Sequence, residues 1–191
     1  YVRAFKSRVF DPKFILPTEQ FLQAYRPFAE EAVIRTSFGD LHTLIAGKGD
    51  KIIIAMHGDG PGSNNECWLP AAVRFAERGI RMLCLSMPGY GKSTGDQYSF
   101  RQSGVVILGE VIQKLQLINK PIILGRSVGG RTAISFASQY PSAVSAVILQ
   151  HPVVPSDGIV SGLRGQRVLL SWAKDDGLFD NALGHATAGH P

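Results

Sequence analysis

Hydrophobic residues follow two kinds of spacing along this chain. In Lys51–Met56 they are nearly continuous and mostly β-branched, which is typical of a strand covered on both faces in a parallel sheet. In Phe100–Leu117 they recur every three or four positions, which predicts a helix with one apolar face. Because segments of the two kinds alternate, the chain is predicted to have an α/β fold.

The alternation extends over most of the chain. A hairpin of two strands, Ala32–Ser37 and Leu41–Ala46 around a turn at Phe38–Asp40, is expected ahead of Lys51–Met56. The later elements are expected to be helix Ala71–Arg78, strand Ile80–Ser86, helix Phe100–Leu117, strand Pro121–Leu124, helix Val128–Gln139, strand Ala146–Leu149 and strand Val168–Trp172. Strands joined through helices predict a mostly parallel, doubly wound sheet with helices on both faces. Ligands bind beyond the carboxyl ends of the strands in such sheets.

Length and composition are those of one soluble domain. The chain has 191 residues, of which 45% are hydrophobic and 18% charged, values that exclude disorder and a coiled coil. Residues 1–30 contain three prolines and are expected to form an N-terminal arm with a short helix at Thr18–Tyr25, followed by a single domain over residues 31–191. The longest aliphatic run, Ile52–Met56, is far shorter than the ~20 residues of a membrane span.

Net charge and cysteine content limit which binding partners and which cellular compartment are expected. The net charge is +5, but the first 13 residues carry +3 of it, so it indicates a basic arm, and we expect no nucleic-acid binding. Two cysteines cannot form a disulfide framework. Cys84 lies in an apolar run and is expected to be a buried, inert thiol. These features favour a reducing compartment, taken as the cytoplasm, and leave the oligomeric state open.

Residues 89–94, Gly-Tyr-Gly-Lys-Ser-Thr, carry the Gly-Lys-Ser end of a phosphate-binding P-loop. Two requirements of that motif are missing, because Ser86 stands where its first glycine belongs and a loop rather than a helix follows Lys92. We therefore expect no nucleotide to bind through Lys92.

The pattern Gly-x-Ser-x-Gly occurs twice, and the setting separates the two copies. Residues 91–95, around Ser93, have no predicted strand before them and no predicted helix after them. Residues 125–129, around Ser127, follow a predicted strand and lead into a predicted helix. A strained strand-turn-helix of this kind lifts a serine hydroxyl clear of the sheet, so Ser127 is the candidate nucleophile. The alternative is that Ser127 only caps the helix.

Three motifs together resemble the α/β-hydrolase superfamily of serine hydrolases, over most of residues 32–176. Residues 125–130 (Gly-Arg-Ser-Val-Gly-Gly) are similar to its nucleophile elbow, and residues 57–62 (His-Gly-Asp-Gly-Pro-Gly) look like its oxyanion-hole loop. Residues 87–93 (Met-Pro-Gly-Tyr-Gly-Lys-Ser) are similar to its Pro-Gly-x-Gly-x-Ser turn. A departure is Ser86, where the family has an aspartate.

The resemblance implies roles for the residues around Ser127. The backbone amides of Val128 and, by analogy, Asp59 would stabilise the oxyanion, with Gly60 as the alternative donor to Asp59. The carboxylate of Asp59 must then turn away from the oxyanion, since its charge would weaken the stabilisation. His57 is implied to be structural rather than a base.

The family order of serine, acid and histidine implies the other two members of a triad. Asp176, after the strand Val168–Trp172, matches the acid, with Asp157 or a role in helix capping as the alternatives. His190 matches the base, with His185, or a base outside this sequence, as the alternatives. Only 13 residues separate Asp176 from His190, too few for the family's helix and strand, so we expect the C-terminal part to be shortened or incomplete.

The predicted connection between the last two strands, residues 151–167, is too short for a cap domain, so a lidless, open site is expected. The resulting hypothesis is a carboxylesterase-like serine hydrolase that cleaves a small-molecule ester or related acyl bond through an acyl-enzyme on Ser127. No metal or organic cofactor is expected, because the five histidines are scattered. The alternative is a non-catalytic binding or interaction module of the same fold.

Overall fold

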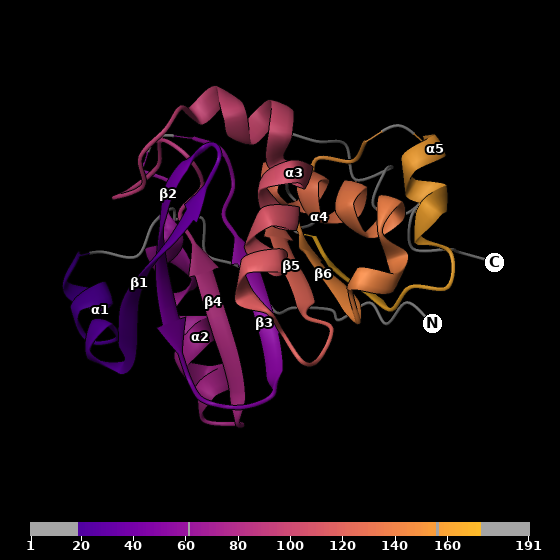
Figure 1. Cartoon of the computed structure of the whole chain (residues 1–191). Coiled ribbons are helices and arrows are strands. Elements are labelled where there is room, and N and C mark those ends of the chain that lie inside the picture. Colours follow the sequence, from indigo (N-terminus) through magenta and orange to yellow (C-terminus); the bar gives the residue numbers. More distant parts are fainter. Residues whose placement is uncertain (1–18, 61, 156, 173–191) are drawn as a thin grey trace.

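Seven strands of the described residues form one sheet. The computed structural model describes residues 19–60, 62–155 and 157–172, and its strands follow the order β1-β2-β4-β3-β5-β6-β7 across the sheet (Figure 1). They are β1 (Ala29–Thr36), β2 (Gly39–Ala46), β3 (Lys51–Met56), β4 (Ile80–Leu85), β5 (Ile122–Arg126), β6 (Ala146–Gln150) and β7 (Val168–Ser171). The pairs β1–β2 and β2–β4 are antiparallel and the other pairs are parallel, so the predicted mostly parallel sheet is confirmed.

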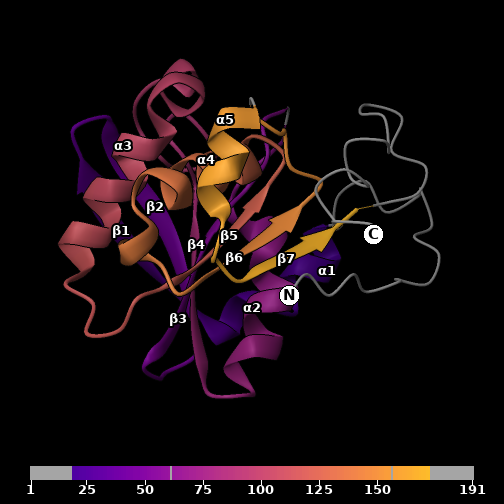
Figure 2. The same ribbon diagram turned by 90° about the vertical axis from the view of Figure 1, so that its right-hand side faces the viewer.

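Helices cover both faces of the sheet, as predicted. They are α1 (Glu19–Gln23), α2 (Leu69–Ala76), α3 (Gln97–Leu115), α4 (Val128–Gln139) and α5 (Asp157–Val160), with the 3-10 helices η1 (Arg26–Phe28), η2 (Asn65–Trp68), η3 (Pro141–Ala143) and η4 (Ser161–Leu163). α3, α4 and α5 lie on one face, and α1 and α2 on the other (Figure 2). No helix in this part of the chain is long and apolar enough to cross a bilayer.

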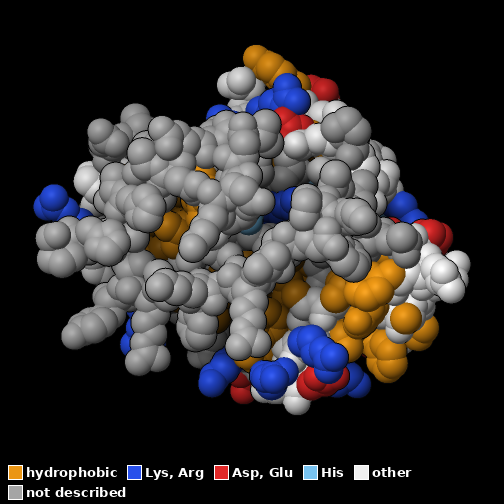
Figure 3. All heavy atoms as spheres, turned by 180° about the vertical axis from the view of Figure 1, so that it is seen from behind, with side chains coloured by type: hydrophobic (Ala, Val, Ile, Leu, Met, Phe, Trp, Pro, Cys, Tyr) orange, Lys and Arg blue, Asp and Glu red, His pale blue; other side chains and the backbone are white. Residues whose placement is uncertain are grey.

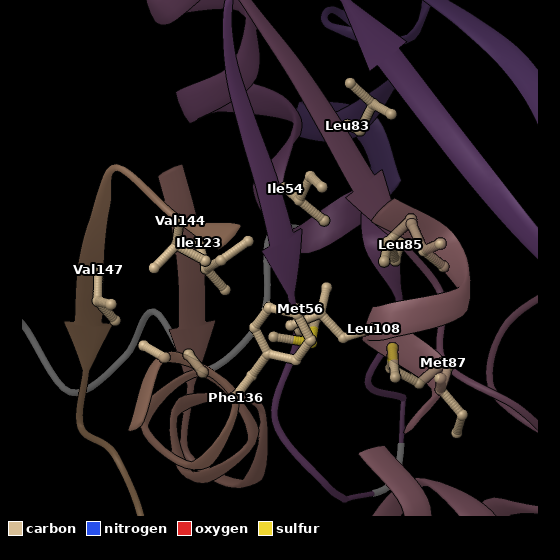
Figure 4. Packing of buried hydrophobic residues seen from close by; sticks show 14 of the residues in the cluster. Ile54, Met56, Leu83, Leu85, Met87, Leu108, Ile123, Phe136, Val144 and Val147 are labelled. Carbon is tan, nitrogen blue, oxygen red and sulfur yellow. The ribbon is translucent and has the colours of Figure 1, made fainter. Parts of the chain in front are cut away.

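β3 lies near the middle of the sheet and contributes to a hydrophobic cluster on each face. Ile54 and Met56 pack with residues of α3 and α4 such as Phe136 (Figure 4). Ile53 and Ala55 pack on the opposite face, in the cluster that includes residues of α2. Successive side chains of a strand point to opposite faces, and full burial of an aliphatic side chain stabilises the fold by about 1.5–3 kcal/mol. The unbroken apolar run in the sequence therefore reflects burial from both sides.

The predicted elements are present, with changes at their ends. β3 and α4 have the predicted bounds. β1 begins at Ala29, three residues before the predicted start, because Ala29 pairs with Ala46 and the hairpin extends to the end of β2. The predicted turn at Phe38–Asp40 is wrong, since Thr36 pairs with Gly39 and only residues 37 and 38 remain in the turn. β1 is an edge strand with only one buried position among its eight, so its hydrophobic pattern marks its ends weakly.

The connection between β6 and β7 is short and packs against α4. It contains α5 and η4, and the Ser138 hydroxyl of α4 donates a hydrogen bond of 2.5 Å to the carbonyl of Ile159. A Cβ on Gly162 would lie 2.7 Å from the Cβ of Ser138, so the two segments are in close contact. No cap-sized insertion separates β6 from β7.

The face that carries α1 and α2 has an exposed apolar groove. Leu22 of α1 is buried in the cluster of that face, whereas Phe28 is 65% exposed. A cavity of about 370 Å³ is lined by Ala24, Tyr25, Phe28, Val73, Arg74, Ala76 and Glu77. Figure 3 shows hydrophobic side chains gathered on this side of the molecule beside basic and acidic ones. The groove lies on the opposite face of the sheet from α4, the helix that follows Ser127.

Candidate active site

Ser127 occupies a sharp turn between β5 and α4. β5 ends at Arg126 and α4 begins at Val128, so the predicted strand-turn-helix is confirmed. Ser127 has φ 51° and ψ −116°, a conformation that costs a residue with a side chain on the order of 1–3 kcal/mol. Its side chain makes no capping hydrogen bond to α4. The alternative of an ordinary helix cap is therefore wrong, because the hydroxyl forms no hydrogen bond to α4.

Two glycines allow the backbone of the turn to pack this tightly. A Cβ on Gly125 would lie 2.2 Å from the carbonyl oxygen of Gly129, and a Cβ on Gly129 would lie 2.5 Å from that of His57. Real Cβ atoms do not approach backbone oxygens so closely, and the close approach joins α4 to the end of β3. A side chain on Gly125 would push β5 away from the start of α4, and a side chain on Gly129 would push α4 away from the end of β3.

The main chain of the turn is tied to the end of β6. The Ser127 amide donates to the carbonyls of Gln150 and His151, both at 3.1 Å. The Ser127 carbonyl accepts hydrogen bonds from the amides of Arg131 at 3.1 Å and Val153 at 3.0 Å. These contacts hold the strained residue from both sides, which is what a fixed nucleophile requires.

His151 is a neighbour of Ser127 that the sequence patterns do not single out. It follows β6 directly, has a φ of 43°, and its ring centre lies 6.1 Å from that of Trp172. Its main chain makes the connection to the turn, because its carbonyl accepts from Ser127 and its amide donates to the Ser171 carbonyl at 2.9 Å. Its place at the carboxyl end of a strand is the one signal that could have drawn attention to it.

The loop after β3 lies against Ser127. A Cβ built on Gly58 would lie 3.1 Å from the Ser127 Cβ and 3.8 Å from its Oγ. Asp59 follows Gly58 in this loop, and Val128 follows Ser127 as the first residue of α4. Within the described residues neither the Asp59 amide nor the Val128 amide has a hydrogen-bond acceptor. The arrangement is compatible with both as oxyanion donors, and this assignment stays a prediction.

The carboxylate of Asp59 is held by two side chains from α3 and from the loop before it. The Tyr90 hydroxyl donates to Oδ1, and Arg101 Nε donates to Oδ2 at 2.5 Å. The hydrogen bond from Arg101 is the main cause that holds the pKa of this carboxyl below its usual value. A cavity of about 350 Å³ adjoins the group and is lined by Asp59, Gly60, Gly62, Ser63, Asn64, Gly89, Tyr90, Gly91, Gln97 and Arg101.

His57 joins the loop after β3 to the turn after β4. Its Nδ1 lies 2.5 Å from the Gly58 carbonyl, and its Nε2 lies 3.0 Å from the amide nitrogen of Met87. These partners set the tautomer, since Nδ1–H must donate to the carbonyl while Nε2 accepts from the amide. Burial lowers the pKa of His57 to about 4. With both nitrogens occupied, the ring is neutral and cannot take the proton of Ser127, as the structural role implies.

The second Gly-x-Ser-x-Gly pattern is a turn held by its serine. Ser93 Oγ donates to the Ser86 carbonyl and accepts from the His42 amide, both at 2.8 Å. Lys92 forms an exposed ion pair of 2.8 Å with Glu31, and the next helix, α3, begins only at Gln97. The helix that a P-loop needs after its lysine is therefore missing here.

Ser86 stands at the end of β4, where the resemblance places an aspartate. It is fully buried, and its hydroxyl accepts a hydrogen bond of 3.1 Å from the Asn65 amide. Its own amide donates to the His42 carbonyl at 2.9 Å. Ser86 thus acts as a structural link between the end of β4 and η2.

The other predicted triad members cannot be placed. Asp176, His185 and His190 lie outside the described residues, and for Asp157 only its place at the start of α5 is described. β7, which precedes Asp176, runs parallel to β6, and Gln150 pairs with Ser171. The strand that leads to Asp176 therefore ends beside the strand that supports Ser127.

The two cysteines are free, and burial disfavours the reactive thiolate form of both. Burial raises the pKa of Cys67 to about 12 and raises that of Cys84 well above its usual value. A thiol needs a lowered pKa to act as a nucleophile at neutral pH. The predicted inert thiol at Cys84 is consistent with its complete burial.

Comparisons with known proteins agree on one family. A 2-hydroxy-6-oxononadienedioate/2-hydroxy-6-oxononatrienedioate hydrolase from Escherichia coli is 30% identical over 145 residues, which cover 73% of this chain and 46% of the relative. An enzyme of the same name from Pseudomonas sp is 29% identical over 112 residues, or 58% of this chain and 40% of the relative. The chain thus spans less than half the length of these curated relatives.

Similarity to solved structures is evidence for the fold alone. A structure described as a predicted CIB-like hydrolase from Thermoplasma acidophilum has a TM-score of 0.71 and 19% identity, covering 84% of this chain and 81% of that one. The sequence profile of the alpha/beta hydrolase fold matches residues 51–162, which include the Ser127 turn and the loops after β3 and β4. Because this match covers more than half of the chain, the chain belongs to the alpha/beta hydrolase fold family.

Proposed function

We propose that the chain is a serine hydrolase that cleaves an ester or related acyl bond of a small molecule through an acyl-enzyme on Ser127. The observation that carries the proposal is the strained Ser127 turn, which leaves the hydroxyl free of α4 and lies directly against Gly58. The curated relatives, which are named as hydrolases, support it. Backbone strain of this kind is concentrated at functional sites.

The chemistry follows from what surrounds the hydroxyl. Ser127 Oγ attacks the carbonyl carbon of the substrate while a histidine takes its proton, since an unassisted hydroxyl is a poor nucleophile. The carbonyl oxygen becomes an oxyanion, which the amides of Val128 and Asp59 stabilise. The histidine returns the proton to the leaving alcohol, and a water molecule then releases the acid and restores the serine.

His190 is the proposed base and Asp176 the acid that orients it, with His185 as the alternative base. Support comes from the chain order of serine, acid and histidine and from the place of Asp176 after β7. His57 does not compete for the role, because both of its ring nitrogens are occupied. Replacing each histidine by glutamine separates the two candidates: the base variant should lose at least a hundredfold in rate, and the other should change little.

The side chain of Arg126 favours a substrate that carries a negative charge near the scissile bond. It directly precedes Ser127 and is exposed, and no carboxylate of the described residues forms an ion pair with it. A guanidinium without a partner is well suited to bind a carboxylate of a ligand. The curated relatives are named for dioate substrates, which carry two carboxylates.

A pair of model esters tests the role of the charge. We expect Arg126→Gln to lower kcat/KM about tenfold for the succinate monoester of p-nitrophenol, which carries a carboxylate, and to leave the neutral acetate ester within about twofold. Equal losses on both esters would contradict a charge-specific role.

A fluorophosphonate probe tests the proposed function itself. The probe phosphonylates only an activated serine, and intact mass followed by peptide mapping locates the adduct. We expect one adduct per chain, on Ser127, and none in the Ser127→Ala variant. A folded wild-type protein that stays unlabelled would contradict hydrolysis and favour the non-catalytic binding module. The two free thiols support a cytoplasmic location for either function.

A further inference from the structure

Asp59 places a negative charge next to a site that must stabilise negative charge. Its amide is the proposed oxyanion donor, while its side chain is 16% exposed and ionised. A carboxylate directed toward the oxyanion would oppose the charge that develops there, and the opposition is strong where little water screens it. The loop can serve catalysis only if another group fixes the carboxylate elsewhere.

Both oxygens of the carboxylate are engaged by side chains that lie outside the Ser127 turn. The Tyr90 hydroxyl binds Oδ1 and Arg101 Nε binds Oδ2. The Tyr90 ring packs against the His57 ring at 4.8 Å between centres, and Tyr90 is itself buried. The tyrosine therefore gives one rigid contact, whereas Arg101 supplies the opposing charge.

Arg101 is itself connected to the helix that begins after the nucleophile. Its backbone carbonyl accepts a hydrogen bond of 2.7 Å from Arg131 Nη2. Arg131 lies in the first turn of α4, and its amide donates to the carbonyl of Ser127. One chain of contacts thus runs from the Ser127 turn through Arg131 and Arg101 to the carboxylate of Asp59.

We propose that Arg101 is a positioning residue for the hydrolysis proposed above: it holds the Asp59 carboxylate against Tyr90, so that the Asp59 amide and not its charge faces the oxyanion. Arg101 touches neither substrate nor the reacting atoms and acts only through Asp59. Its effect belongs to the transition state, in which the oxyanion exists, and not to the bound substrate. Loss of Arg101 should therefore change kcat and leave KM nearly unchanged.

The test compares four variants with p-nitrophenyl acetate as substrate and the fluorophosphonate as probe. We expect Arg101→Met to lower kcat and the phosphonylation rate by roughly tenfold to a hundredfold, with KM within about twofold. The double variant Arg101→Met with Asp59→Asn removes the uncompensated charge and should regain most of the lost rate relative to Arg101→Met alone. Asp59→Asn alone completes the cycle and gives the coupling between the two residues.

A matched control removes an arginine ion pair elsewhere. Arg74 of α2 pairs with Glu77 at 3.2 Å on the opposite face of the sheet, and Arg74→Met should leave kcat unchanged. Thermal unfolding of every variant confirms that rates refer to folded protein. A merely structural Arg101 would lower stability without recovery in the double variant, and this result would overturn the proposal.

The two proposals fail in different ways. A wild-type protein that neither hydrolyses the ester nor reacts with the probe removes the proposed function and the role of Arg101 with it. An active wild-type protein with an equally active Arg101→Met variant overturns the role of Arg101 alone.

Discussion

Ser93 and Ser127 each stand at the centre of a Gly-x-Ser-x-Gly pattern, but their backbone settings and the partners of their hydroxyls differ. Ser93 lies in a turn, and its hydroxyl is consumed by hydrogen bonds to the main chain of Ser86 and His42. Ser127 lies between a strand and a helix, at positive φ, and its hydroxyl caps nothing. The five-residue pattern thus carries no chemistry by itself. What matters is whether the backbone around it leaves the hydroxyl free.

The largest difference is expected in reactivity. Ser127→Ala removes the proposed nucleophile and should abolish probe labelling and lower ester hydrolysis by at least a thousandfold. Ser93→Ala keeps the whole site, so the labelling rate per folded chain should match the wild type. The comparison fails if the Ser93 variant loses labelling while it stays folded.

Ser93 should instead affect stability. Its hydroxyl makes two hydrogen bonds in a partly buried place, and the loss of such partners costs about 1–3 kcal/mol. Urea unfolding of Ser93→Ala should show this decrease in the free energy of unfolding, while Ser127→Ala should be as stable as the wild type or more so. A more stable Ser127→Ala is the usual sign that a site has been selected for activity rather than stability.

Alanine substitutions at one glycine of each pattern should also have different effects on activity. An alanine at Gly129 would meet the His57 carbonyl at 2.5 Å, whereas an alanine at Gly91 would meet the Ser86 hydroxyl at 2.8 Å. Gly129→Ala should separate the loop after β3 from the nucleophile turn, with a loss of several kcal/mol in stability and more than tenfold in activity. Gly91→Ala also bears backbone strain, at φ 55°, and should lower stability without a specific loss in labelling rate per folded chain.

His57 connects the two regions, and its buried neutral ring predicts a pH dependence. Its pKa is about 4 in the fold against about 6.5 when unfolded, so the unfolded chain binds more protons between these values. The stability that this ring contributes is complete above pH 6.5 and is lost as the pH falls toward 4. The total is about 3 kcal/mol.

Urea unfolding at pH 7 and pH 5 measures this dependence while the carboxylates stay ionised. The wild type should lose stability over the interval, and His57→Gln, although less stable at pH 7, should show a flatter slope. An equal slope in both proteins would mean that other groups cause the loss.

The smallest effect is expected at Lys92, the neighbour of Ser93 that gives the loop its P-loop likeness. The lysine and Glu31 are 66% and 58% exposed in their ion pair, and such pairs contribute little to stability. Lys92→Ala should unfold at the same urea concentration as the wild type, and calorimetry with ATP should detect no binding to either protein. Binding of ATP that the variant loses would restore the nucleotide hypothesis.

Local patterns were sufficient for the fold and for the strand-turn-helix setting of Ser127. β3 and α4 have the predicted bounds because each shows its hydrophobic pattern within one continuous segment of sequence. The pattern of β3 reflects burial on both faces, and that of α4 reflects one apolar face. The setting of Ser127 could be predicted for the same reason, since its strand and its helix are its direct neighbours in sequence. Edge strand β1 was placed less well, because only one of its eight residues is buried.

Contacts between distant segments could not be predicted. The need for the Asp59 carboxylate to turn away follows from its charge alone, but its partner Arg101 lies 42 residues further along the chain. Only the packing of α3 beside the loop after β3 brings the two together. His151 was missed for a similar reason, because its carbonyl reaches Ser127 through the pairing of β5 with β6.

The connection between β6 and β7 is a place in the described sheet where an insertion would disturb no strand pairing. Since α5 and η4 rest on α4 through a contact such as that of Ser138 with Ile159, a longer segment could be grafted between the two strands without altering the sheet. Surface connections of this kind accept insertions more readily than any strand. A segment inserted at this junction would start at the carboxyl end of β6, where the carbonyls of Gln150 and His151 contact the Ser127 turn, and would leave the order of the strands unchanged.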